Sequence, residues 1–210
     1  MINEYKTLLQ PGVAEIYIEK SRFIGYSAPV ASEQEAVAFI GEIKARHNDA
    51  AHNVPAYVIG MGNEIQRYSD DGEPSGTAGI PILEVIKKED LRNVVIIVTR
   101  YFGGIKLGTG GLIRAYTKGA KIAVDAAPII TKRLHKLFQV EIEYTLLGKV
   151  QNEIIQSEYI IKEVKYDHLV HFFVYVPLFK EKLFQKQLIE LTNARCEMAE
   201  EGLEYLIVKK

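Results

Sequence analysis

The stretch Val94–Ala127 has the sequence VVIIVTRYFGGIKLGTGGLIRAYTKGAKIAVDAA, and the fold of the region around it depends on this stretch. Its opening run of apolar, mostly β-branched residues predicts a strand that is buried on both faces and ends at Thr99–Arg100. A glycine-rich loop follows, and after it apolar residues recur at helical spacing, which predicts a helix with one buried face. The apolar positions of that face are Leu112, Ile113, Tyr116, Ala120, Ala123, Val124 and Ala127.

The same segment is basic, because residues 99 to 121 include five basic side chains and no acidic one. A strand, a glycine loop and a helix N-terminus in succession offer backbone N–H groups to an anion. We therefore predict that this surface binds phosphate, nucleic acid or a protein partner. The candidate residues are Arg100, Gly103, Gly104, Lys106, Gly108, Thr109, Gly110, Gly111, Arg114, Lys118 and Lys121. In the alternative interpretation the glycines only shape the chain and the basic residues form a solvated helix face.

Two familiar nucleotide-binding motifs do not fit this loop. A P-loop ends in Gly-Lys-Ser/Thr, which is absent from Gly104–Thr109. A dinucleotide-binding fingerprint that started at Gly108 would meet Ile113 where its third glycine belongs.

Composition describes an ordinary water-exposed globular chain of 210 residues with a formal net charge of −1. No apolar run approaches the ~20 residues of a membrane span, and the charged residues near the N-terminus do not fit a signal peptide. The lone cysteine, Cys196, excludes an internal disulfide and fits a reducing compartment. We expect a cytoplasmic protein with no membrane partner and no strong overall attraction to nucleic acid.

The pattern of apolar residues restarts after Arg133 and predicts two domains, residues 1–133 and 134–210. The first begins with short strands, continues with a helix whose capping box is Ser32–Glu35, and ends with the stretch quoted above. In the second domain, apolar residues alternate from Phe138 to Tyr144 and predict its first strand. The elements that follow give the order βαββαβ, which is the ferredoxin-like arrangement. The last strand is predicted at Leu203–Val208. The fold class is therefore α+β, with a linker near Ala127–Leu134.

An acidic turn, Asp70–Gly76, places three carboxylates close together. Such a turn can hold a divalent ion or supply acid–base groups, but aspartate and glycine also suit a tight turn. We expect the carboxylates to fix the loop, by accepting backbone N–H groups or by pairing with a base such as Arg100. The spacing of His47 and His52 is not that of a helical zinc pair, and Cys196 has no evident histidine partner. We therefore predict no metal site, no cofactor and no catalytic residue.

The second domain raises an RNA interpretation, because RNA-recognition domains share its topology and stack bases on aromatic residues of the sheet. His171, Phe173 and Tyr175 are expected on the open face of this sheet. Acidic residues of the preceding strand, Glu141 among them, would repel phosphate. We favour packing of this face on another protein or domain.

Two blocks, RYSDDGEPSGTAG at residues 67–79 and RYFGG…LGTGGL at residues 100–112, resemble the IMPACT/YigZ/YvyE family. The second domain resembles that family's bacterial C-terminal domain, which is similar to a ferredoxin-like domain of elongation factor G. The resemblance implies a first domain similar to the second domain of a small-subunit ribosomal protein. Eukaryotic relatives restrain a translation-control kinase by competing for its activator, and they carry a further N-terminal domain, so that partner is not carried over. The family-motif residues are His52, Asp70, Asp71, Gly72, Glu73, Pro74, Ser75, Gly76 and Thr77.

Two hypotheses about function remain open. In the first, a non-catalytic protein contacts RNA, the ribosome or a translation-related protein through the basic glycine-rich surface, without DNA sequence specificity. In the second, an enzyme or binder acts on a phosphorylated small molecule or nucleotide at Asp70–Gly79 and Arg100–Gly111. The absence of an evident nucleophile, base or metal spacing favours the first. Convergence of Asp71, Glu73 and Arg100 in a deep pocket would favour the second.

Overall fold

The computed structural model describes residues 2–157 and 159–208, which divide into two units. Unit 1 contains residues 2–131 and unit 2 contains Lys132–Val208. Each unit has its own apolar core, so each is described by itself. None of the helices in the described part of the chain is long and apolar enough to span a membrane.

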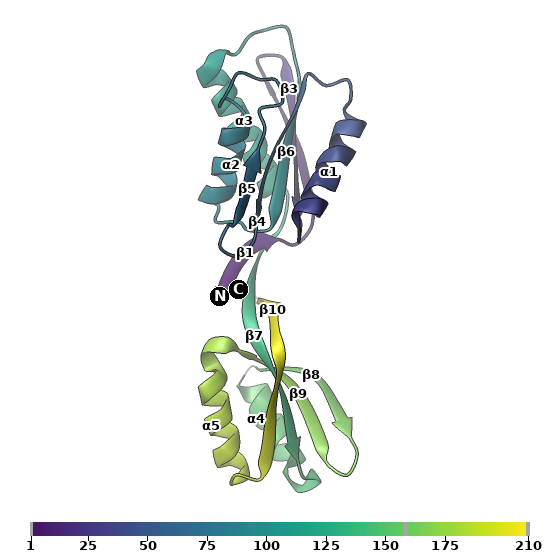
Figure 1. Cartoon of the computed structure of the whole chain (residues 1–210), viewed down its shortest axis with the longest axis vertical. Coiled ribbons are helices and arrows are strands. Elements are labelled where there is room, and N and C mark those ends of the chain that lie inside the picture. The colour runs from purple at the N-terminus through teal and green to yellow at the C-terminus, as the bar shows by residue number, and fades with distance from the viewer. Residues whose placement is uncertain (1, 158, 209–210) are drawn as a thin grey trace. The chain divides into compact units, whose positions relative to one another are not determined.

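Unit 1 is built on one antiparallel sheet with helices on both faces (Figure 1). Across the sheet the strands are β2 (Gly12–Ile18), β3 (Ser21–Pro29), β6 (Val94–Tyr101), β4 (His52–Ile59) and β5 (Ile65–Tyr68). The helices are α1 (Glu33–Arg46) on one face, and α2 (Gly79–Lys88) and α3 (Gly108–Asp125) on the other. A further strand that the sequence pattern did not reveal, β1 (Glu4–Leu8), forms a bridge from Lys6 to Leu91.

The central strand β6 confirms the prediction of a strand buried on both faces. Val94, Ile96 and Val98 pack towards α2 and α3, and Val95 and Ile97 belong to the core beneath α1. The predicted end at Thr99–Arg100 was wrong, because pairing with β3 carries the strand to Tyr101. Arg100 therefore lies inside a strand and not in the glycine loop.

Helix α3 lies close against the sheet through its predicted apolar face. A Cβ added at Gly25 of β3 would come within 2.1 Å of the Gly119 carbonyl oxygen, so helix and strand are in direct backbone contact. The prediction that Ile113 belongs to the buried face was wrong, because this side chain is 39% exposed. Position 113 is one helical turn before Thr117, which is also exposed, and both lie beyond the edge of the buried stripe.

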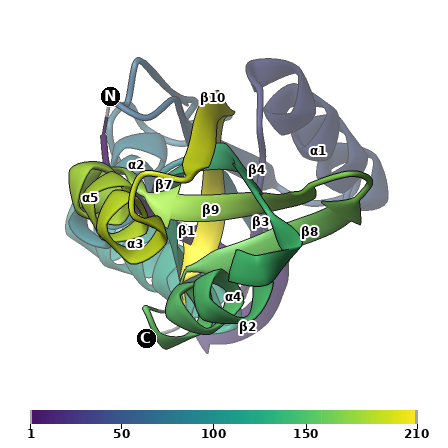
Figure 2. The ribbon, with the colours of Figure 1, turned by 90° about the horizontal axis from the view of Figure 1, so that it is seen from below.

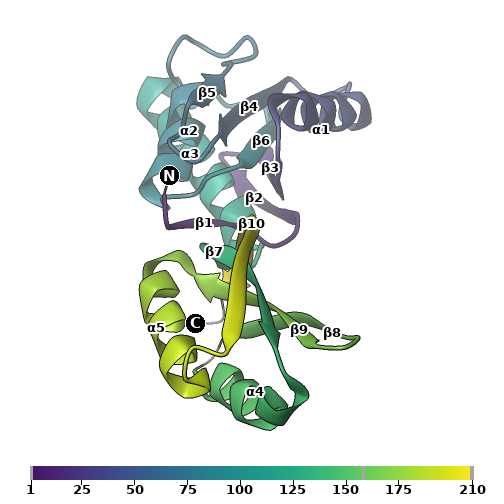
Figure 3. The same ribbon diagram turned by 60° about the horizontal axis from the view of Figure 1, so that its bottom comes forward.

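Unit 2 has the ferredoxin-like fold that the βαββαβ pattern predicted. Its strands lie in the order β10 (Cys196–Val208), β7 (Ile129–Ile142), β9 (Val170–Pro177) and β8 (Ile160–Tyr166). Helices α4 (Leu147–Gln156) and α5 (Glu181–Thr192) pack on one face of this sheet (Figures 2 and 3). Short 3-10 turns, η1 (Tyr144–Leu146) and η2 (Leu178–Lys180), precede the two helices.

The two units divide between Thr131 and Lys132, inside the segment Ala127–Leu134 where the boundary was predicted, but this segment is not a loop, and two predicted strand bounds of unit 2 were wrong. The expected linker Ala127–Leu134 contains the start of β7, because the β-branched residues that follow Pro128 favour a strand. Tyr144 lies in η1 and is half exposed, outside the alternation that it seemed to continue. Strand β10 begins at Cys196, well before Leu203, because Cys196 and Met198 pack against the core.

The open sheet face of unit 2 is less aromatic than predicted. The opposite set of β9 side chains, Val170, Phe172, Val174 and Val176, is fully buried as expected. His171 and Phe173 are partly exposed, but Tyr175 is only 7% exposed and its hydroxyl donates to Glu204. Because Tyr175 is nearly buried, Phe173 and Tyr175 do not form a pair of exposed rings on which two bases could stack. Packing of this face on another protein remains a prediction.

Candidate functional site

The acidic turn is held by its first carboxylate, Asp70. Its oxygens accept hydrogen bonds from the backbone N–H groups of Gly76 (2.8 Å), Ala78 (3.1 Å) and Gly79 (2.8 Å), at the start of α2. Burial acts to raise the pKa of Asp70, but the three N–H donors outweigh it, so the pKa is lower than usual. The carboxylate therefore stabilises the N-terminus of α2.

The second carboxylate, Asp71, ties the turn to two other elements. Its Oδ1 accepts from Lys44 Nζ of α1 at 2.6 Å, and its Oδ2 accepts from the backbone N–H of Asn53 in β4 at 2.7 Å. The carbonyl of Asp71 accepts from Nδ1 of His52 at 2.8 Å. The other ring nitrogen, Nε2, is therefore the one that faces Glu73, 3.7 Å from its Oε1.

The third carboxylate, Glu73, is buried in a network with Arg100 and Tyr116. Oε1 accepts from Arg100 Nη1 at 2.6 Å and from the Tyr116 hydroxyl at 2.6 Å. The side chains of Glu73 and Arg100 are only 3% and 6% exposed, so a strong ion pair lies in the interior. Burial, and next the hydrogen bond to Glu73, raises the pKa of Tyr116 far above its ordinary value. Together these contacts confirm that the three carboxylates fix the loop.

A pocket of about 540 Å³ lies above this network, which forms part of its floor. Its lining residues come from β4, the acidic turn, the end of β6 and the start of α3, and they are Ala51, His52, Glu73, Pro74, Arg100, Phe102, Lys106, Leu107, Gly108, Thr109 and Leu112. We call it the Arg100 pocket. His52 and Arg100 meet there because they are direct partners across β4 and β6.

The glycine loop connects the end of β6 to the N-terminus of α3, and its residues Lys106 and Leu107 line the Arg100 pocket. Gly108 begins that helix with φ +67°, a left-handed conformation that glycine adopts without strain. Gly103 passes so close to Lys20 that an added Cβ would lie 2.1 Å from its carbonyl carbon. The N-cap residue of α3, Leu107, supplies no side-chain cap, and the first two residues of the helix, Gly108 and Thr109, line the pocket.

A second hollow, of about 500 Å³, lies on the other side of Lys106 and Leu107. Three basic side chains, Lys106, Arg114 and Lys118, line it together with the acidic Glu19. We call these three the basic surface. Lys121 is not among them, because it pairs with Glu89 at 3.0 Å and with Asp125 at 2.5 Å. Its hydrogen bonds, to Asp125 first and then to Glu89, raise the pKa of Lys121.

The structure thus separates the predicted site residues into three groups. Lys106, Gly108 and Thr109 line the Arg100 pocket with His52, Glu73, Pro74 and Arg100, whereas Asp70 and Asp71 support the turn behind it. Gly111, Arg114 and Lys118 line the second hollow. The remaining motif and loop residues, Gly72, Ser75, Gly76, Thr77, Gly103, Gly104 and Gly110, are absent from the lining of both hollows.

Sequence reasoning missed the apolar side of the Arg100 pocket. Phe102 is 52% exposed at its mouth, with its ring centroid 5.4 Å from the Arg100 guanidinium carbon. Leu107 and Leu112 complete this wall, and Tyr116 supports Glu73 from α3. An aromatic residue directly after a buried strand was the available signal for Phe102. Among the described residues no group of three or more His, Cys, Asp or Glu side chains is arranged to hold a metal ion.

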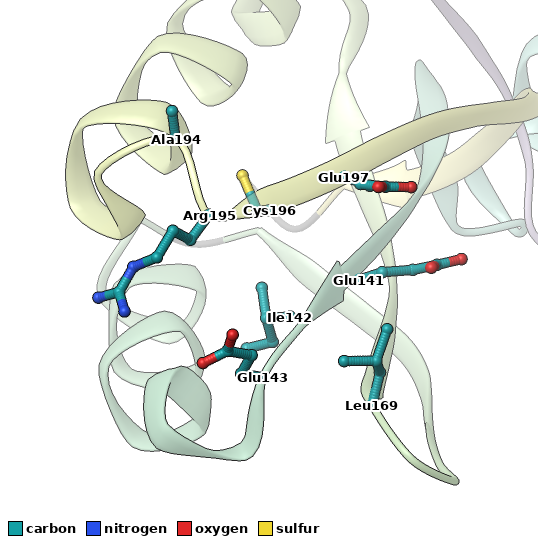
Figure 4. A pocket seen from close by; sticks show the side chains of 8 residues that line it. All are labelled: Glu141, Ile142, Glu143, Leu169, Ala194, Arg195, Cys196 and Glu197. Carbon is teal, nitrogen blue, oxygen red and sulfur yellow. The ribbon is translucent and has the colours of Figure 1, made fainter.

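Unit 2 has a pocket of different character, with a volume of about 440 Å³ (Figure 4). It is lined by Glu141, Ile142, Glu143, Leu169, Ala194, Arg195, Cys196 and Glu197. Figure 4 shows Glu141 and Glu197 pointing in the same direction, with Arg195 and Glu143 nearer the helices. Its lining therefore carries three carboxylates and one cation.

These two folds, an α/β unit with a glycine-loop pocket followed by a ferredoxin-like unit, define a two-domain α+β protein. Residues 19–124 match the Impact N-terminal domain, and residues 140–195 match a domain of unknown function, DUF1949. The chain is 46% identical over 206 residues to the IMPACT family member YvyE of Bacillus subtilis (strain 168), which covers 98% of this chain and 95% of that protein. The chain belongs to the IMPACT family.

Two further comparisons agree with this assignment. Over 151 residues the chain is 38% identical to the IMPACT family member YigZ of Escherichia coli (strain K12), covering 68% of this chain and 74% of that protein. The crystal structure of a hypothetical protein, 29% identical, covers 96% of this chain and 99% of its own with a TM-score of 0.62. The fold and family predicted from the two motif blocks are therefore confirmed.

Proposed function

We propose that this protein is a non-catalytic, cytoplasmic binding protein associated with translation, and that its basic surface contacts the phosphate backbone of RNA. One observation carries the proposal: Lys106, Arg114 and Lys118 surround one hollow beside the uncapped N-terminus of α3. The association with translation rests on the resemblance to the IMPACT family.

The local charge suits a phosphate backbone although the whole chain is nearly neutral. The hollow is lined by three cations and one carboxylate, Glu19. The N-terminus of α3 adds a partial positive charge of roughly half a unit. Lys–phosphate and Arg–phosphate contacts release counterions, so binding would be weak, independent of sequence and sensitive to salt.

The alternative, an enzyme that acts on a phosphorylated small molecule, finds its best support in the Arg100 pocket. Of the three residues whose convergence would favour it, Glu73 and Arg100 line this pocket, but Asp71 does not. The carboxylates that would act as acids or bases are already bound to backbone N–H groups, Lys44, Arg100 or Tyr116. These contacts favour ligand binding over catalysis.

The test is a titration of structured RNA at several salt concentrations. The double variant Arg114→Ala, Lys118→Ala removes two cations from the basic surface, so the slope of log affinity against log salt should fall by about two units. Lys121→Ala is the matched control, because it removes a cation from the same helix that is already paired with Glu89 and Asp125. Equal slopes for the double variant and wild type would overturn the proposal.

A further inference from the structure

We propose that the Arg100 pocket binds a phosphate monoester of a sugar that carries a planar base, that is, a nucleoside monophosphate. The same chemistry is present in a free nucleotide and in the 5′-phosphorylated end of an RNA. Only the RNA end as a source rests on the proposed function, because a free nucleotide needs no contact with the basic surface.

Arg100 brings a buried hydrogen-bond donor without a partner, its Nε, to the lining of this pocket. Residue Arg100 is 5% exposed, and Glu73 takes only its Nη1. Its Nε is buried and has no hydrogen-bond partner among the described residues. A buried donor without a partner is destabilising, so a ligand oxygen that accepts from it gains affinity. Nε and Nη2 form the side edge of the planar group, and such an edge binds an oxyanion through two parallel hydrogen bonds.

The positive end of α3 lies at the same pocket. Gly108 and Thr109 are the first residues of this 18-residue helix, and both line the pocket. Its N-cap residue, Leu107, makes no side-chain cap hydrogen bond, and the first turn carries no acidic residue. A phosphate in this place would accept those N–H groups and meet the helix dipole.

The lining of the Arg100 pocket keeps a net positive charge after the Glu73–Arg100 pair is counted. Glu73 and Arg100 neutralise each other in the floor, and Lys106 then leaves the lining positive. A phosphate monoester carries about −1.5 to −2 charges at pH 7. A dianion therefore matches Lys106, the helix N-terminus and the unpartnered Nε of Arg100 better than a neutral ligand does.

A bare phosphate would leave the apolar wall of the pocket unused. Phe102 is half exposed at the mouth, and Leu107, Leu112 and Pro74 lie along the lining. A nucleobase can stack on such an exposed aromatic ring, whereas inorganic phosphate cannot. The volume of about 540 Å³ falls in the range of roughly 300–1,000 Å³ that is typical of small-molecule sites.

The experiment titrates the full chain with AMP, inorganic phosphate and adenosine by calorimetry. We expect AMP to bind at least tenfold more tightly than inorganic phosphate and at least tenfold more tightly than adenosine. Phe102→Ala should weaken AMP about tenfold and leave the affinity for phosphate unchanged, because only the ring contact is removed. Equal binding of AMP and adenosine would overturn the proposal.

A charge-insertion pair then places the site without weakening the fold. Thr109→Asp puts a carboxylate at the first turn of α3, where it stabilises the helix dipole and repels phosphate. AMP affinity should fall at least tenfold while the melting temperature stays equal or rises. Thr117→Asp adds the same charge on an exposed position of the same helix and is the matched control. If both variants weaken AMP equally, the phosphate does not bind at this pocket.

RNA oligonucleotides with a 5′-phosphate or a 5′-hydroxyl distinguish the two sources. A preference for the phosphorylated end that Thr109→Asp abolishes would identify the RNA end, and AMP binding without that preference would identify a free nucleotide. If neither AMP nor the phosphorylated end is preferred, this inference is wrong. The proposed function would still stand if the slope of log RNA affinity against log salt falls by about two units in the Arg114→Ala, Lys118→Ala variant.

Discussion

The two units carry pockets of similar size and opposite chemistry. In the Arg100 pocket the one lining carboxylate, Glu73, is nearly buried and bound to Arg100 and Tyr116. In the unit 2 pocket Glu143 and Glu197 are exposed, and Arg195 is the one cation of the lining (Figure 4). A carboxylate therefore contributes differently to the two linings. Glu73 is neutralised by Arg100 inside the protein, whereas Glu143 and Glu197 are exposed to solvent.

The largest expected effect breaks the internal pair of unit 1. Glu73→Ala leaves the charge of Arg100 buried without its partner and should destabilise the protein by about 3–5 kcal/mol. Urea denaturation measures this difference. Glu143→Ala in unit 2 removes an exposed carboxylate and should cost less than about 0.5 kcal/mol. Similar costs for both changes would show that the two carboxylates do not differ as described.

A smaller effect is the pH dependence of stability, which should differ between an aspartate of the acidic turn in unit 1 and an aspartate of a turn in unit 2. The pKa of Asp70 is lower than usual in the folded protein, so its contribution to stability is complete above the ordinary carboxyl pKa of about 3.9. That contribution is lost as the pH falls through the lower folded value. Asp70→Asn should cost about 1 kcal/mol at pH 7, as for a lost helix cap, and the difference from wild type should shrink below about pH 4.

The matching aspartate of unit 2 is Asp167. The backbone N–H of Leu169, and next His171, lower its pKa, but the group is fully exposed. Asp167→Asn should therefore give a much weaker pH dependence than Asp70→Asn. Unfolding curves at pH 7, 5 and 3 compare the two variants. An equal response would contradict the assignment of Asp70 as the cap of α2.

The smallest expected effect concerns the unit 2 pocket as a ligand site. Glu143→Gln, Glu197→Gln removes two of its three carboxylates. AMP affinity should change less than twofold, because we place the phosphate in unit 1, and stability should change by less than about 0.5 kcal/mol. A tenfold gain in AMP affinity would show that the unit 2 pocket also accepts phosphate once its repulsion is removed.

Local patterns predicted most of the elements correctly because each one depends on neighbours in the sequence. The β-branched run became β6, and alternation around Phe138 became part of β7. Ser32 accepts from the backbone N–H of Glu35, as the capping box predicted, although the Glu35 carboxylate reaches Ala31. The two motif blocks identified the family, which is a property of the residues alone.

The site depended on contacts between residues far apart in the chain. The sequence offered Arg100 both as a cation of the basic surface and as a partner for the acidic turn, and the structure confirms the second role, because strand pairing places it beside His52 and it pairs with buried Glu73. Lys121 looked like part of the basic surface, but α2 ends near it and supplies the neighbouring Glu89 as a partner.

The sequence therefore predicted most of the strands and helices and the βαββαβ order, although not β1 or the start of β10, because hydrophobic period and capping act over a few residues. Tertiary structure decided which charges remain available to a ligand. Burial and ion pairing depend on the three-dimensional neighbours of a side chain, and no spacing rule along the chain gives those neighbours. The unpartnered Nε of Arg100 is the clearest example of a group whose availability the tertiary structure decides, because Arg100 is buried where β6, the acidic turn and α3 meet.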